Sequence, residues 1–217
     1  MNHTEPFRFV TERRLVLLTG QRARSLPELL SILRDISGSS IFYHTHHGFL
    51  SHHWEKPVVY NDFALWVGEA LQELALAEEL AALDLLAYTS IRQVRESIIS
   101  RIKPHLPNPT VRPRQCLSGH EFHFCRSMSF VMPTLLVAKD IGDFFVKLGH
   151  VSNVSLYYHF LEARLRLGRP TNDFSQWLAW RGAPELAAAI DRLDPYTRTL
   201  DELRAEIIDL GRSHGFH

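Results

Sequence analysis

The two halves of this 217-residue chain repeat one another. Phe7-Arg-Phe9 returns as Phe122-His-Phe124, and Ser40-Ile-Phe-Tyr-His44 returns as Ser155-Leu-Tyr-Tyr-His159, in both cases 115 positions later. Units of this kind usually bury a face against each other, so the copies are expected to pack as one globule. Positions that both copies keep are expected to form the scaffold. Positions that only one copy has are the better candidates for function.

Further matches fix the extent of the copies. Asn61-Asp-Phe-Ala-Leu-Trp66 returns as Asn172-Asp-Phe-Ser-Gln-Trp177 after 111 positions. We assign residues 1–103 to copy one and residues 122–217 to copy two. The stretch 104–121 between them is rich in proline, which interrupts helices, and is interpreted as a linker.

The bulk composition excludes several classes of protein. The net charge is zero, which gives no support for binding nucleic acid or a polybasic contact with a membrane. The apolar runs are far shorter than the ~20 residues that a membrane helix needs, and the first residues do not resemble a signal peptide. Two cysteines cannot form a disulfide framework. We therefore expect a cytoplasmic protein.

Helix signals dominate both copies. Ser25 and Glu28 are spaced as a capping box, and the leucines that follow form a helical stripe. Asn61 and Asn172 each precede an aspartate and are good N-cap residues. The predicted fold is mainly α, with two similar helical units and short β segments at the start of each copy.

The histidines suggest a metal site. His44 and His47 are one helical turn apart, and the matching positions in copy two hold His159 and Glu162. Metal sites in helical bundles often take such i, i+3 ligands from facing helices. If the two helices face each other between the copies, these four side chains would suit Zn, Fe or Mn.

The aspartates Asp62 and Asp173 match between the copies as His44 and His159 do. They could orient the metal-bound imidazoles through hydrogen bonds behind the ligands. The alternative is that each shared histidine simply bonds a carboxylate or a carbonyl inside its own bundle, because buried polar groups need partners. On that interpretation the pairs belong to the scaffold.

Other candidates occur in one copy only. Arg164 and Arg166 stand where copy one has Phe49 and Ser51, and clustered guanidinium groups can grip an anion. The more ordinary alternative is salt bridging to nearby carboxylates.

His46 and His53 are specific to copy one and would share one helical face. They could line a ligand pocket.

The run Ser39-Ser-Ile-Phe-Tyr-His-Thr-His-His47, with Ser51-His-His53 and Asn61-Asp-Phe-Ala-Leu-Trp66, resembles a family of uncharacterised bacterial proteins. The resemblance extends over nearly the whole chain. It implies a small soluble protein and supplies no catalytic residues.

Two hypotheses on function follow. The first is a helical transition-metal-binding protein, with a metal-dependent hydrolase or oxidoreductase as its enzymatic form. The second is a non-enzymatic module that binds a small-molecule ligand or a partner protein, and a homodimer is compatible with both. Whether the chain is an enzyme stays open at this point.

Overall fold

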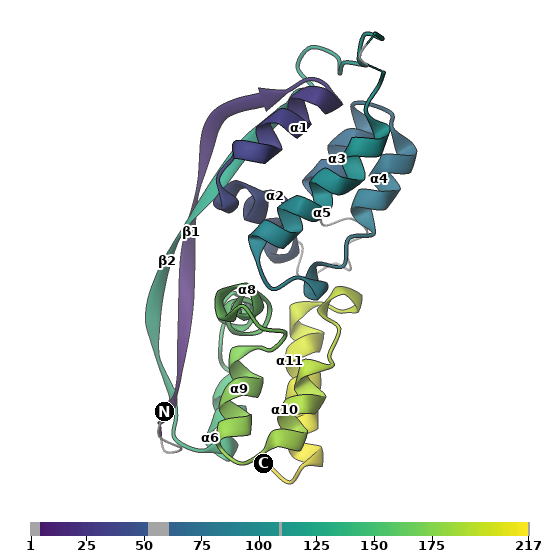
Figure 1. Cartoon of the computed structure of the whole chain (residues 1–217). Coiled ribbons are helices and arrows are strands. Elements are labelled where there is room, and N and C mark those ends of the chain that lie inside the picture. Colours follow the sequence, from purple (N-terminus) through teal and green to yellow (C-terminus); the bar gives the residue numbers. More distant parts are fainter. Residues whose placement is uncertain (1–4, 52–60, 109, 217) are drawn as a thin grey trace. The chain divides into compact units, whose positions relative to one another are not determined.

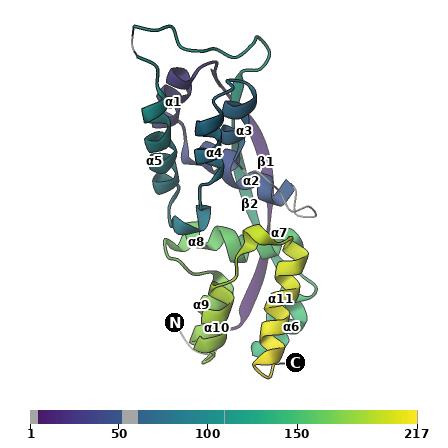
Figure 2. The same cartoon turned by 90° about the vertical axis from the view of Figure 1, so that its right-hand side faces the viewer.

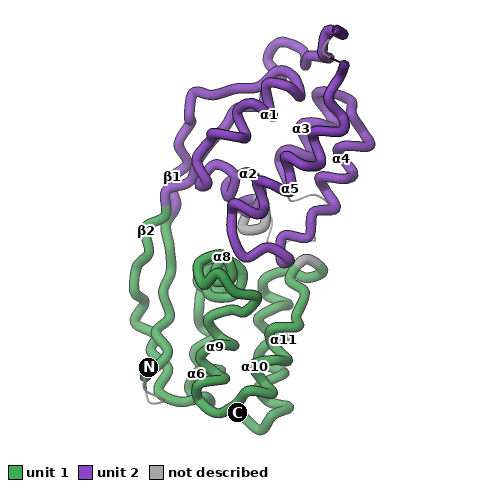
Figure 3. The backbone as a smooth tube through the Cα atoms, in the orientation of Figure 1, with its two compact units in different colours: residues 1–13, 52–57, 129–217 green, residues 14–51, 58–128 purple. Residues whose placement is uncertain are grey.

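The computed structural model of the chain describes residues 5–51, 61–108 and 110–216. These residues form two compact units (Figure 3). Unit 1 contains residues 5–13 and 129–216, and unit 2 contains residues 14–51 and 61–128 without residue 109. Each unit thus takes residues from both copies of the repeat.

Two long strands correct the predicted fold class. β1 (Phe7–Ala23) and β2 (Phe122–Ala138) have 17 residues each and pair as a two-stranded antiparallel sheet. They run side by side in both views (Figures 1 and 2). Strands make up 17% of the described chain and helices 55%, so the fold is mixed α and β and not mainly α. The prediction of short β segments was wrong about their length.

Exposure explains why the strands were underestimated. Alternation of apolar and polar residues marks a strand only where one of its faces is buried. Phe7 and Phe9 are buried, but Leu15, Leu18 and Leu135 further along the strands are 55%, 77% and 101% exposed. The exposed part of β1 therefore carries no alternating pattern of apolar and polar residues.

The helices of copy one belong to unit 2 and those of copy two to unit 1. Unit 2 has α1 (Leu26–Asp35), α2 (Gly38–Ser51), α3 (Asp62–Glu69), α4 (Leu74–Ala81) and α5 (Ile91–Ile102), with short 3₁₀ turns at Leu85–Ala87 and Lys103–His105. Unit 1 has α6 (Ile141–Leu148), α7 (Asn153–Tyr157), a π-helical turn (Tyr158–Glu162), α8 (Ala163–Leu167), α9 (Asp173–Trp180), α10 (Pro184–Asp191), a 3₁₀ turn (Pro195–Thr197) and α11 (Leu200–Ser213). No helix in the described ranges is long and apolar enough to cross a membrane.

Most predicted helix starts are confirmed. The side chains of Asn61 and Asn172 cap α3 and α9 by accepting backbone N–H groups, as expected of N-cap residues. The capping box at Ser25 was wrong, because the Ser25 side chain makes no capping bond. The side chain of Glu28 accepts the N–H of Arg24, the residue before Ser25, whereas a capping box would use the N–H of Ser25 itself.

The cores of the units are built on an exchange of strands. Phe7 and Phe9, at the start of copy one, pack on Phe144 in the helices of copy two, with ring centroids 5.3 and 5.5 Å away. Phe122, at the start of copy two, stacks on Phe63 in the helices of copy one at 5.0 Å. Each helical bundle is therefore completed by the first half of the other copy's strand.

Candidate functional site

His159 of unit 1 connects a carboxylate to the backbone of β1. Its Nδ1 lies 2.7 Å from Oδ2 of Asp173, and its Nε2 accepts the N–H of Val10 at 2.9 Å. Because Nε2 is an acceptor, the proton of the neutral ring is on Nδ1 and is donated to the carboxylate. Both ring nitrogens of this buried histidine are therefore engaged.

His44 of unit 2 repeats this arrangement. Its Nδ1 lies 2.9 Å from Oδ2 of Asp62, and its Nε2 accepts the N–H of Cys125 at 2.9 Å. The aspartates differ in one respect: the side chain of Asp62 is 48% exposed and that of Asp173 is 15% exposed. The two histidines thus bind equivalent residues of the two strands, Val10 of β1 and Cys125 of β2.

Other residues shared by the copies hold the same strand segments. In unit 1 the hydroxyl of Ser155 donates to the carbonyl of Val10 at 2.6 Å, and Thr134 donates to Phe9 at 2.7 Å. The indole N–H of Trp177 donates to the carbonyl of Glu5 at 3.0 Å.

The equivalents in unit 2 are Ser40 to Cys125 at 2.6 Å, Thr19 to Phe124 at 2.8 Å and Trp66 to His120 at 2.7 Å. The serine, threonine, histidine and tryptophan that the two copies share therefore bind the other copy's strand.

This geometry bears on the four predicted metal ligands. Nε2 of His44 and Nε2 of His159 each accept a backbone N–H of a strand, so either nitrogen could bind a metal only after this hydrogen bond is broken. His47 stacks on Tyr43 at 4.8 Å, and burial together with the nearby charge of Arg14 lowers its pKa. Glu162 is half-buried at the end of the π-helical turn.

Within the described residues, no group of three or more His, Cys, Asp or Glu side chains is placed to hold a metal ion. The four-ligand site would combine residues of both units, and it stays a prediction.

The remaining candidates lie in different places. Arg164 is buried and donates to the carbonyl of Asp191 at 3.1 Å. His46 is buried, stacks on Phe42 at 4.9 Å and bonds Thr45. His53 lies outside the described residues. Arg166 lines a pocket.

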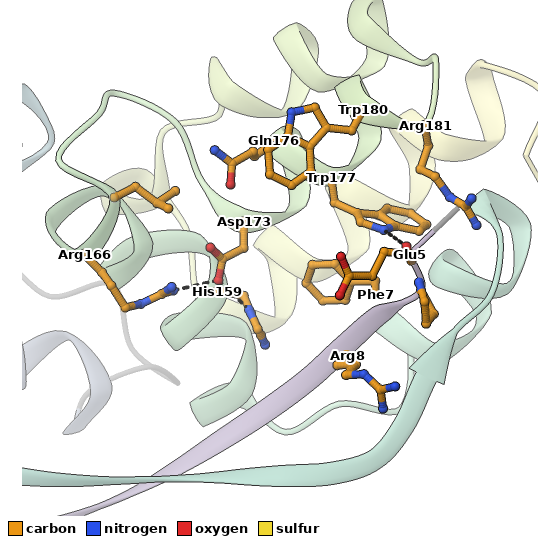
Figure 4. A pocket seen from close by; sticks show the side chains of 12 residues that line it. Glu5, Phe7, Arg8, His159, Arg166, Asp173, Gln176, Trp177, Trp180 and Arg181 are labelled. Carbon is orange, nitrogen blue, oxygen red and sulfur yellow. Dashed lines mark hydrogen bonds and ion pairs between the residues drawn. The ribbon is translucent and has the colours of Figure 1, made fainter. Parts of the chain in front are cut away.

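That pocket has a volume of about 330 Å³ and lies within unit 1 (Figure 4). Residues 5–8, which lead into and begin β1, form one side of it, and α8 and α9 form the other. Arg166 and Arg181 approach from opposite ends, with Trp177 between them (Figure 4). The pocket therefore brings the start of copy one against the helices of copy two.

An ion pair closes one end of the pocket. Arg166 donates to Oδ2 of Asp173 at 2.6 Å, and its guanidinium lies 4.4 Å from the ring centroid of Tyr158. Burial would raise the pKa of Asp173, but hydrogen bonds from His159 and Arg166 outweigh burial, so this pKa is lowered. Burial acts to lower the pKa of Arg166, but the hydrogen bond to Asp173 and the nearby charges of Asp173, Tyr158 and Glu162 together outweigh burial, so that pKa is raised. The pair therefore stays charged.

The other end carries Arg181, which follows α9. Its guanidinium lies 5.1 Å from the ring centroid of Trp177 and donates to the carbonyl of Lys139. Trp180 also lines the pocket and is 43% exposed.

Sequence reasoning missed Trp180 and Arg181, although the repeat could have revealed them. At the same offset of 111 residues, copy one has Glu69 and Ala70 in their places. The lining thus combines residues 5–8 of copy one, the shared residues His159, Asp173 and Trp177, and the residues specific to copy two, Arg166, Leu167, Gln176, Trp180 and Arg181.

Comparison with known proteins places this chain in a family. A family model described as "Family of unknown function (DUF5752)" matches residues 4–212. The chain belongs to the DUF5752 family. The expected membership in a family of uncharacterised proteins is thereby confirmed.

A solved structure is similar to this DUF5752 protein over nearly its whole length. It is the structure of OrfY from Thermoproteus tenax, with 30% sequence identity and a TM-score of 0.81. The match covers 95% of this chain and 94% of the OrfY chain. No protein with a curated description matches.

Proposed function

We propose that this DUF5752 protein is a non-enzymatic ligand-binding module and that the pocket in unit 1 binds a small organic anion. The observation that carries the proposal is the difference between the copies. The shared histidines, serines, threonines and tryptophans already serve to dock the strands. Arg166, Trp180 and Arg181 occur in copy two only and gather at one pocket.

The charges around the pocket favour an anion. Arg166 is balanced by Asp173 at 2.6 Å. The pocket lining as a whole holds three guanidinium groups and two carboxylates, those of Arg8, Arg166, Arg181, Glu5 and Asp173. One negative charge on a ligand would compensate the remaining positive charge, and guanidinium groups bind carboxylate and phosphate in fixed geometry.

The free thiols Cys116 and Cys125 fit the reducing cytoplasm, where we place the protein.

Titration of the purified protein with a panel of small anions tests the proposal. The panel contains aliphatic and aromatic carboxylates, amino acids, inorganic phosphate and phosphate esters, and binding is followed by thermal shift and calorimetry, since a ligand of the folded state raises the melting temperature. Arg181→Ala, which installs the residue of copy one, should weaken binding at least about tenfold. An indifferent Arg181→Ala variant, or a panel without any binder, would contradict the proposal.

Arg92→Ala is the matched control. Arg92 lies on α5 in unit 2, its side chain is 86% exposed, and it pairs with Glu96 on the surface. Its removal takes away the same charge, and Arg92 is not part of the pocket lining, so the control should bind like the unchanged protein.

A further inference from the structure

We infer that the exposed apolar surface of β2 in unit 1 binds a second copy of this chain, so that the protein forms a symmetric homodimer. Four side chains define this surface, which we call the β2 patch: Phe130, Val131, Met132 and Leu135. None of them lines the pocket of unit 1, so the inference is independent of the proposed function.

The β2 patch is exposed on both faces of the strand. Successive side chains of a strand point to opposite faces, and every residue from Ser129 to Pro133 is exposed. Phe130 is 48% exposed, Val131 is 50% exposed and Leu135 is 101% exposed. Single apolar residues are common on protein surfaces, whereas a contiguous apolar patch usually marks an interaction site. We therefore expect the β2 patch to be covered in the working protein.

The strand of copy one has a matching apolar run in unit 2. Leu15, Val16 and Leu18 of β1 lie 115 positions before residues 130, 131 and 133, and they are 55%, 46% and 77% exposed. Phe9 and Phe124, nearer the start of each strand, are fully buried. Both copies thus combine a buried strand start with an exposed apolar middle. Because the exposed residues add nothing to the core of either unit, their repetition indicates a contact outside the chain.

The charge pattern of β2 indicates what covers the patch. No charged side chain occurs from Ser127 to Ala138, although 22% of the chain is charged. A two-fold symmetric contact places a surface against its own copy, so that charges of one sign in it would repel each other. A segment without charges avoids this repulsion. A nucleic acid or an acidic partner would instead require lysine or arginine in the patch.

Pro133 limits how the second copy is bound. In the two-stranded sheet β2 has β1 as its neighbour, and among the described residues no strand pairs with its other edge. Proline has no backbone N–H, so a strand added there would lack a hydrogen bond at this position. Strand addition is a common way for an extended peptide to bind a sheet edge. The proline disfavours such a peptide, and the second copy contacts the β2 patch through side chains.

Sedimentation velocity of the full-length chain over a range of concentrations tests the inference. The unchanged protein should show the mass of two 25.0 kDa chains. Two patch variants, Phe130→Glu with Leu135→Glu and Phe130→Lys with Leu135→Lys, should each raise the Kd of the dimer at least about a hundredfold, because each brings like charges together. An equimolar mixture of the two variants should form a dimer again, since opposite charges then meet. This recovery would also show that both variants are folded.

Val146→Glu with Leu74→Glu is the matched control. These two residues are 56% and 64% exposed on α6 and α4, outside the β2 patch. The control carries the same two added charges as the glutamate patch variant, and it should stay a dimer.

Three results would overturn the inference. The first is an unchanged protein that is monomeric at every concentration. If that monomer binds phosphatidylcholine vesicles and both patch variants do not, the patch belongs to a lipid surface instead. The second is a dimer that both patch variants keep, which would place the contact on another surface. The third is a mixture of the two variants that stays monomeric, which would mean that the β2 patch does not face its own copy.

Discussion

The imidazole of His159 accepts the backbone N–H of Val10 at 2.9 Å, across 149 positions of sequence. Its other nitrogen is bound to Asp173 at 2.7 Å. One side chain in copy two therefore fixes the strand of copy one, and His44 does the same in the opposite direction through Cys125. Each copy of the repeat thus binds the strand of the other copy, and the two shared histidines, His44 and His159, have a structural function.

Removal of this connection should be costly. His159→Ala leaves the N–H of Val10 without its acceptor and leaves Arg166 as the remaining side-chain partner of Asp173, so we expect a loss of about 2–4 kcal/mol in the free energy of unfolding. Urea denaturation measures it, and hydrogen exchange should show lost protection at Val10. His150→Ala removes an exposed histidine and should have little effect. Equal stability of the two variants would refute the docking function of His159.

Exchange of strands predicts a crossed pattern of damage. Phe9 is fully buried in unit 1 and Phe124 is fully buried in unit 2. Phe9→Ala should therefore loosen α6–α11, the helices of copy two, while Phe124→Ala should loosen α1–α5. Each truncation should cost about 3–5 kcal/mol. Hydrogen exchange with mass spectrometry resolves the helices, and an uncrossed pattern, with Phe9→Ala loosening α1–α5, would contradict the exchange.

Local features of the fold could be predicted from the sequence because they depend on neighbouring residues. The apolar stripe from Leu26 to Leu33 is buried as predicted, and Asn61 and Asn172 cap their helices. The exchange could not be predicted, because no local pattern says which bundle covers Phe9. Its partner Phe144 is far along the chain, and the matched copies make both pairings equally consistent with the sequence.

The candidate site was predictable only in part. Comparing the copies pointed to Arg166, which does line the pocket. The same comparison pointed to His46, which is buried against Phe42, and Arg164, which bonds the backbone of Asp191. Comparing the copies shows which residues differ between them. Whether the side chain of such a residue points into a pocket or into the core depends on packing, which the comparison does not give. Glu5 and Arg8 enter the pocket only because β1 crosses to copy two.

Buried histidine makes unit 2 sensitive to acid. Burial, followed by the nearby charge of Arg14, lowers the pKa of His46 from 6.5 to about 3. The folded state therefore needs the neutral ring, while the unfolded chain takes up a proton below pH 6.5. The stability that this histidine contributes is present above pH 6.5 and is lost as the pH falls from there toward 3, by up to about 1.4 kcal/mol per pH unit.

The variant His46→Leu, which installs the residue of copy two, should reduce this slope between pH 6 and pH 4. Urea denaturation at each pH gives the comparison. His47 has a lowered pKa as well and keeps part of the dependence in the variant. An unchanged slope would mean that His46 is not buried in neutral form.

The metal hypothesis can be tested through the hydrogen bonds that His44 and His159 make to the strands. If His44, His47, His159 and Glu162 hold Zn, Fe or Mn, elemental analysis of untagged protein should find about one metal ion per chain, and the double variant His47→Ala, Glu162→Ala should lose it. A metal on Nε2 of His44 or His159 would also displace the N–H of Cys125 or Val10. Metal loading should then raise hydrogen exchange at those two amides. A folded, metal-free protein that binds none of the three ions and keeps both amides protected would contradict the metal hypothesis. The function of these histidines would then be to bind the strands.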